Sequence, residues 1–320
     1  MNKLFFKIVL SLGLLAALLL NMDVDALKNA SHLVKASAWG YALVFIIAQL
    51  LLLSLRWMYL VNVGRYRMNY AEALEITVAS LVANLVFVTT ISGIVVRVAM
   101  AIQYGASLFK SIFATAIDRL MTLAALLLLT TIFLPSLALY VDLPLHKNIS
   151  MLIGALMLVM FVFTPMITLA IVRKLPNFSL SQANIRSGIR YLQLLLNNNV
   201  LLGKILSVSL LAQLCFFLAV YHIAISAGVS LSFLQIMIVL PAIAIISSMP
   251  FSFGGWGLRE GAFVYGLGIL GVPMETAFSI SVQIGLVSLV ATVLAGIPTL
   301  ITSNSPFRQA QKIAVKREDS

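Results

Sequence analysis

The chain alternates long apolar stretches with short polar breaks from end to end, and the length of each stretch indicates what it can form. About 20 apolar residues make a helix that crosses the roughly 30 Å hydrocarbon core of a membrane. Six stretches have this length, and charged, Pro or Asn/Gly-containing breaks bound each of them. The predicted crossings are 4–22, 37–60, 108–134, 149–172, 200–227 and 275–301.

Two further apolar regions, 72–104 and 231–270, have a different pattern. Each has a long arm, an interruption rich in Gly and Ser, and then a short arm, 94–104 or 258–270. The short arms hold about 11 and 13 residues, too few to cross the hydrocarbon core. We therefore predict an all-α polytopic membrane protein with about six full transmembrane helices and two re-entrant helical hairpins, or eight spans if the hairpins cross.

Composition and charge narrow the class of protein. Of the 320 residues, 62% are hydrophobic and only 10% are charged. In a typical soluble domain about half of the residues are apolar and about a quarter are charged. This composition excludes a water-soluble globule and a hidden soluble catalytic domain of usual size. The net charge of +11 does not indicate a nucleic-acid partner, because the sequence has no basic stretch with interleaved aromatic residues.

The positions of the 21 Lys and Arg residues predict the orientation of the chain. If the N-terminus is cytoplasmic and each hairpin returns to its starting side, fifteen of them face the cytoplasm: Lys3, Lys7, Arg56, Arg65, Arg67, Lys110, Arg173, Lys174, Arg186, Arg190, Lys204, Arg308, Lys312, Lys316 and Arg317. The outside holds Lys28, Lys35 and Lys147. The positive-inside rule therefore predicts an integral cytoplasmic (inner) membrane protein with both termini cytoplasmic. A cleaved signal peptide is the alternative for the first apolar stretch, although its length favours a retained helix.

The main polar insertion, 177–199, has the pattern of an interfacial helix. Arg186 and Arg190 are four residues apart and share one face. The opposing apolar stripe consists of Ile185, Ile189, Leu192 and Leu196. Two interpretations remain open, a connector that lies on the cytoplasmic leaflet and a regulatory site.

The two hairpin regions resemble each other in sequence. With Arg97 placed over Arg259, residues 90–93 (TISG) align with 252–255 (SFGG), just before each short arm. The charge count makes one hairpin start from the cytoplasm and the other from outside, which predicts an inverted repeat. Coincidence among apolar residues is the alternative. The predicted divisions are a membrane domain (1–302), repeat 1 (about 37–134), repeat 2 (about 200–301) and a basic cytoplasmic tail (303–320).

Three arginines, Arg97, Arg119 and Arg259, remain inside membrane segments. Each is costly there, by about 2.5 to 3.5 kcal/mol at a helix centre, and so needs a partner or a wet cavity. Asp118 and Glu260 are available, but neighbours on a helix point about 100° apart. We therefore expect pairing between elements, such as Asp118 with a hairpin arginine, rather than between Arg259 and Glu260. Architectural ion pairs and a ligand site both remain open.

Residues 250–260 (PFSFGGWGLRE) form the strongest local motif. Its glycines allow backbone amides to turn toward an anion, and a helix starting near residue 258 would aim its positive end there. Arg259 adds a bidentate donor for a lipid phosphate, and Trp256 either stacks on a headgroup or anchors at the interface. The predicted substrate-binding residues are Arg97, Arg259, Glu260, Gly254, Gly255, Gly257, Trp256, Asp118 and Arg119.

No enzymatic chemistry is indicated. His32, His146 and His222 are scattered, so neither a metal site nor a catalytic base is predicted, and no phosphate-binding loop occurs. We predict no catalytic residue, metal or other cofactor.

Several motifs resemble one family of membrane proteins. They are 55–57 (LRW), Arg97, 118–120 (DRL), and most specifically 250–260 followed by 271–273 (GVP). Over about residues 4–302 the chain resembles the flippase-like family named for the transmembrane region of lysylphosphatidylglycerol synthases. It departs at 90–94, where the family tends to have a Pro and then Gly-Gly-Asp. Synthase members carry a large soluble aminoacyl-transfer domain after this region, whereas only about residues 302–320 follow it here. The resemblance therefore implies no lipid aminoacylation by this chain.

The resemblance implies that the chain moves an anionic or carrier-linked lipid between leaflets. The expected partner is a membrane phospholipid or a polyprenyl-phosphate-linked lipid. Two alternatives stay open: a scaffold or accessory subunit of an envelope glycosyltransferase or lipid synthase, and a secondary transporter of a small anion.

Overall fold

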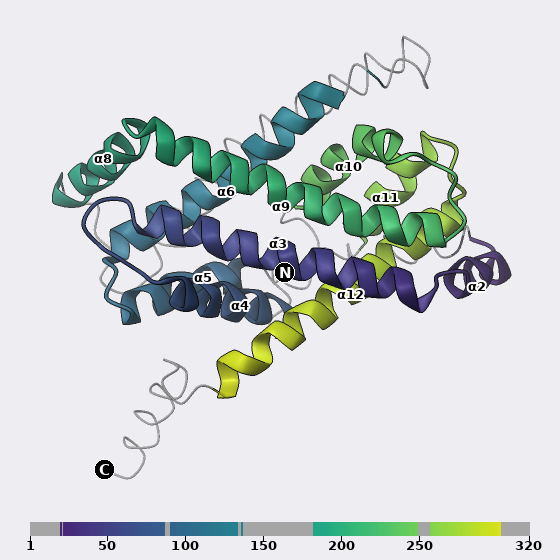
Figure 1. Ribbon diagram of the computed structural model, residues 1–320, viewed down its shortest axis with the longest axis horizontal. Coiled ribbons are helices and arrows are strands. Elements are labelled where there is room, and N and C mark those ends of the chain that lie inside the picture. Colours follow the sequence, from purple (N-terminus) through teal and green to yellow (C-terminus); the bar gives the residue numbers. More distant parts are fainter. Residues whose placement is uncertain are drawn as a thin grey trace, which may run out of the picture.

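The computed structural model describes residues 20, 22–86, 90–133, 136, 182–248 and 257–301, and its regular elements in these ranges are all helices (Figure 1). Their bounds are α2 (Val24–His32), α3 (Ala36–Val61), α4 (Tyr70–Val86), α5 (Thr90–Gln103), α6 (Leu108–Phe133), α8 (Gln182–Leu196), α9 (Asn199–Ser226), α10 (Phe233–Ser247), α11 (Leu258–Gly268) and α12 (Met274–Ile301). The predicted all-α class is confirmed.

Four of these helices, α3, α6, α9 and α12, are long and apolar enough to cross a membrane. They hold 26, 26, 28 and 28 residues, so each is about 40 Å long. Four predicted crossings are thereby confirmed. The crossing at 149–172 and nearly all of the one at 4–22 lie outside the described residues, as does the tail at 303–320, so the total of six stays a prediction.

The sequence of α3 explains how the long helices pack. Ala38, Ala42, Ile46 and Leu50 recur at every fourth residue and are buried. Because a helix repeats every 3.6 residues, this spacing forms one continuous stripe. Along α3 lies α9, which runs in the opposite direction (Figure 1). Tyr41, on another face of α3, is 58% exposed, as expected where a helix meets lipid.

Two pairs of shorter helices enter the bundle from opposite ends (Figure 1). In the first pair, α4 and α5 pack together, and the hydroxyl of Tyr66 before α4 donates to the Tyr104 carbonyl after α5 at 2.7 Å. In the second pair, α10 packs on α11. These helices hold 17, 14, 15 and 11 residues. The arrangement is the one an inverted repeat of hairpins requires, although the repeat and the re-entrant character stay predictions.

The interruption in the first hairpin differs from the predicted one. The predicted Gly turn at 90–93 is wrong, because these residues form the first turn of α5. Gly93 is needed for packing instead, since its backbone N–H donates to Asn84 Oδ1 at 2.8 Å. A Cβ at this position would overlap the Asn84 side chain and the Ser80 carbonyl oxygen. The glycine therefore permits the close approach of α5 to α4.

We expect Gly93→Ala to destabilise the chain by about 1 to 3 kcal/mol, because the backbone oxygen of Ser80 cannot move aside without shifting α4. Thermal unfolding in detergent measures the effect. Gly203→Ala is the matched control, because nothing lies within 4 Å of a Cβ there, and alanine in a helix is worth about 0.5 to 1 kcal/mol over glycine. Equal melting temperatures for the two variants would contradict this packing.

One end of the bundle is strongly basic. At this end α3 ends and α6 and α9 begin (Figure 1). The basic residues that flank these helices in the sequence therefore lie close to one another. We call it the basic end, and among the described side chains it carries Arg65, Arg67, Lys110, Arg190 and Lys204. Most of the predicted cytoplasmic charges that the structure describes therefore share one end.

The segment predicted to be an interfacial helix forms a helix, α8, at the basic end, and its interfacial position stays a prediction. It packs on the bundle through Gly188, Tyr191 and Leu195, which are buried. Two members of the predicted apolar stripe, Ile189 and Leu196, are 50% and 61% exposed. These two side chains face away from the protein, as lipid contact at an interface would require, whereas Leu192 is half-buried against the bundle.

Candidate functional site

A buried charge cluster joins three helices in the interior of the bundle. Arg56 of α3 donates from Nε to Asp118 Oδ1 of α6 at 2.8 Å, and Arg97 of α5 donates from Nη1 to Asp118 Oδ2 at 2.7 Å. The three residues are 2%, 8% and 5% exposed. Asp118 lies ten residues after the start of α6, about 15 Å along the helix. The cluster therefore lies well inside the bundle.

Side chains around the cluster complete its hydrogen bonds. Arg56 Nη1 donates to Ser209 Oγ of α9 at 3.1 Å, and Arg97 Nη2 donates to Ser80 Oγ of α4 at 3.4 Å. The Arg97 guanidinium also lies 4.9 Å from the centre of the Trp57 ring, a cation–π contact. The indole N–H of Trp57 is buried and has no hydrogen-bond partner within the described part of the chain. One donor is therefore left unused beside the arginines.

The cluster has more positive than negative charge. Both oxygens of Asp118 are occupied, one by each arginine. A third guanidinium, on the partly buried Arg119, is close enough to interact electrostatically with Arg56, Arg97 and Asp118. Among the described residues, one carboxylate thus pairs with two cations and has a third nearby. A buried excess of this kind favours an anion, because uncompensated charge in a low-dielectric interior is costly.

The cluster confirms one sequence prediction and corrects another. Asp118 does pair with a hairpin arginine, Arg97, across two elements. The assignment of Arg56 to the cytoplasmic side was wrong, because this residue lies inside the bundle. It was counted there because it lies near the end of an apolar stretch. The adjacent Trp57, also fully buried, was part of the 55–57 motif and was the available signal.

A second ion pair lies at the start of α11. Arg259 donates to Glu260 Oε1 from Nε at 2.9 Å and from Nη2 at 2.6 Å, and Glu260 is completely buried. The expectation that these neighbours cannot pair was wrong. Glu260 turns back to accept the N–H of Gly257 at 2.6 Å, and the long arginine side chain bends to reach the same carboxylate.

The space for Arg259 is provided by a glycine on α12. A Cβ at Gly285 would overlap the Arg259 guanidinium. The Arg259 side chain remains 21% exposed, and Ser281 Oγ adds a contact to Glu260 at 3.4 Å. The described contacts of Arg97 and Arg259 belong to two separate clusters, so the structure does not bring these two predicted residues together.

The predicted glycine-rich loop is described only at its last residue. Gly257 precedes α11 with a φ of +84°, a left-handed conformation that favours glycine. Gly254, Gly255 and Trp256 lie outside the described residues, so their predicted contacts to a phosphate stay predictions.

Comparison with known protein families assigns the family of the chain. A family model of the lysylphosphatidylglycerol synthase transmembrane region matches residues 4–296. The chain belongs to this family. Neither a curated protein nor a solved structure matched the chain. Membership of the lysylphosphatidylglycerol synthase transmembrane-region family, together with the long apolar helices, makes this an integral membrane protein linked to lipid handling.

In this family member we expect Glu260→Gln to cost about 1 to 3 kcal/mol of stability, because the Arg259 guanidinium loses its charged partner while one amide N–H₂ faces it. The backbone cap of Gly257 should survive, since the amide oxygen still accepts. Thermal unfolding checks the effect against Glu275→Gln, a partly exposed control in the first turn of α12. Similar melting temperatures for both variants would show that the pair contributes little.

Proposed function

We propose that this family member moves an anionic or carrier-linked lipid between the two leaflets of the membrane. The observation that carries the proposal is the positive excess around Asp118, whose single carboxylate pairs with both Arg56 and Arg97 and is followed on α6 by a third arginine, Arg119. A guanidinium presents a planar fork of donors that suits a phosphate group. The link of the family to lipid handling makes a lipid phosphate the natural source of that anion.

In this proposal the headgroup phosphate approaches Arg97 and Arg119, while the acyl chains stay in the surrounding lipid. The unused indole N–H of Trp57 is available as a further donor. Arg259, whose side chain is 21% exposed at the start of α11, offers a second position for the phosphate. Rocking of the two proposed inverted repeats against each other would expose the lipid to alternate leaflets.

The orientation belongs to the same proposal. We place the chain in the cytoplasmic (inner) membrane with the basic end toward the cytoplasm, because Lys and Arg are enriched on cytoplasmic loops. Both termini then face the cytoplasm. No chemical step by this chain is part of the proposal.

One alternative is supported by a specific observation. Arg56 and Arg97 each bond both Asp118 and a serine, which is also what a purely architectural ion-pair cluster would show. In that case the chain would serve as a scaffold or accessory subunit of an envelope glycosyltransferase or lipid synthase.

A transporter of a small soluble anion would use the same cluster with a ligand that has no acyl chains.

Reconstitution into liposomes with headgroup-labelled lipids tests the three functions together. We expect labelled anionic lipid to become accessible to an external quencher faster than in protein-free liposomes. A scaffold would leave accessibility unchanged. A small-anion transporter would move a soluble phosphate ester instead. Either of those outcomes would contradict lipid translocation.

A further inference from the structure

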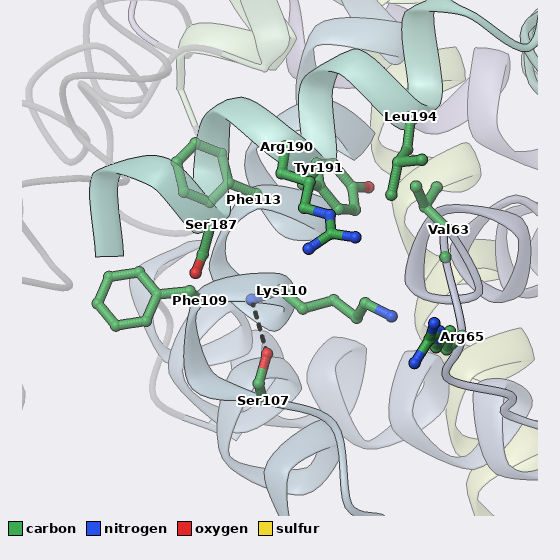
Figure 2. A pocket seen from close by; sticks show the side chains of 11 residues that line it. Val63, Arg65, Ser107, Phe109, Lys110, Phe113, Ser187, Arg190, Tyr191 and Leu194 are labelled. Carbon is green, nitrogen blue, oxygen red and sulfur yellow. Dashed lines mark hydrogen bonds between the residues drawn. The ribbon is translucent and has the colours of Figure 1, made fainter. Parts of the chain in front are cut away.

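A pocket of about 690 Å³ opens at the basic end, apart from the buried charge cluster (Figure 2). It lies between the segment after α3, the start of α6 and the inner side of α8. Arg65, Lys110 and Arg190 line it, one from each of these three segments. Figure 2 shows their cationic ends directed toward the same space. The fold therefore gathers three charges from distant parts of the sequence.

The pocket is electrostatically suited to an anion. None of its described lining residues is Asp or Glu, and the described structure pairs none of the three cations with a carboxylate. Lys110 lies 5.2 Å from the centre of the Tyr66 ring, which holds its chain in place across the pocket. The pocket also lies at the first turn of α6, whose helix dipole places partial positive charge there.

The walls of the same pocket are apolar and aromatic. Phe109 and Phe113 of α6 and Tyr191 and Leu194 of α8 line it beside the cations. Beside it, the exposed apolar side of α8 would lie in lipid if α8 is interfacial. A compact inorganic anion would leave these walls uncovered, whereas an amphiphile with an anionic head would contact both surfaces.

We propose that this pocket binds the phosphate group of an anionic amphiphile at the basic end of the bundle. The shared chemistry is a phosphate ester held by Lys110, Arg190 and Arg65, with its first carbons against Phe113 and Leu194. The ester comes either from a lipid headgroup or from a soluble metabolite. The site goes beyond the proposed translocation, because binding here requires no movement across the membrane.

The test measures binding of a fluorescent phosphatidic acid to the full chain in detergent by fluorescence anisotropy. Two charge-assisted contacts are removed in the double variant Lys110→Gln/Arg190→Gln, so we expect at least about tenfold weaker binding. Lys204→Gln, an exposed lysine at the same end that does not line the pocket, should bind as the wild type does. The charge-preserving Lys110→Arg/Arg190→Lys should retain most of the affinity, which separates lost charge from lost fold.

Competition identifies the source of the phosphate. Displacement by unlabelled phosphatidic acid but not by glycerol 3-phosphate or phosphatidylcholine supports a lipid headgroup. Equal displacement by glycerol 3-phosphate would assign the site to a soluble phosphate ester and would overturn the contribution of the apolar walls. Unchanged binding in Lys110→Gln/Arg190→Gln overturns the site, as does an equal loss in Lys204→Gln or in the charge-preserving variant. A chain that binds at the pocket yet fails to translocate lipid would overturn only the proposed function.

Discussion

Replacing Asp118 with Asn is expected to lower the melting temperature of the detergent-solubilised chain by roughly 5 to 10 °C. The carboxylate compensates two buried guanidinium groups, one on each oxygen. Asparagine offers one oxygen and one N–H₂, so Arg56 or Arg97 would face a donor instead of an acceptor. Removing one side of a buried ion pair costs about 3 to 5 kcal/mol.

The control for this change is Asp25→Asn, because Asp25 is exposed in the first turn of α2. Surface substitutions of this kind stay within about 0.5 kcal/mol. Thermal unfolding and gel filtration of both variants measure the difference. A melting temperature for Asp118→Asn within the error of the Asp25→Asn value would show that the cluster is not holding α3, α5 and α6 together.

Replacing Arg97 with Gln is expected to slow anionic lipid translocation about ten- to hundredfold, because one charge-assisted contact to the phosphate is lost. Stability should fall less than in Asp118→Asn, since Asp118 keeps its bond to Arg56. The measurement is the rate of headgroup accessibility in liposomes with equal amounts of folded protein. Lys204→Gln, a distant exposed residue on α9, controls for loss of a positive charge in general.

The two variants separate the proposed function from its architectural alternative. If Arg97→Gln translocates lipid at the wild-type rate while remaining folded, Arg97 is not a substrate-binding residue. If both variants lose stability together and neither changes transport per folded molecule, the arginines serve only to hold the helices.

The sequence predicted the helices better than it predicted their interruptions. The crossing at 37–60 rests on more than 20 apolar residues, and α3 spans Ala36–Val61. The break of the first hairpin was placed at a glycine, whereas Gly93 lies inside α5 and serves a contact with α4. A single glycine permits either a turn or close packing, and only the neighbouring helix decides which occurs.

The partners of the buried charges were only partly predictable. The cost of isolated charge in a membrane correctly required a partner for Arg97. Local geometry failed at Arg259, because the side chain is long enough to bend back to its neighbour Glu260. Arg56 was missed because a position near a helix end in the sequence does not reveal depth in the bundle.

Two other features were not predicted from the spacing of residues. The short helix α2 begins at the capping residue Asp23, whose carboxylate accepts the N–H groups of Asp25 and Ala26. Its pattern is too short to stand out beside the long apolar stretches. The basic pocket joins Arg65, Lys110 and Arg190, which are up to 125 positions apart in the sequence. In the sequence each of these residues served only to predict membrane orientation. The fold places all three around one pocket.

The most direct test of the account is lipid translocation by the triple variant Arg56→Met/Arg97→Met/Asp118→Leu. Replacing a buried ion-pair cluster by apolar residues of similar size is often neutral or stabilising, so the variant should fold. The account predicts that anionic lipid in liposomes carrying this variant becomes accessible no faster than in protein-free liposomes. A folded triple variant that translocates anionic lipid at the wild-type rate would contradict it.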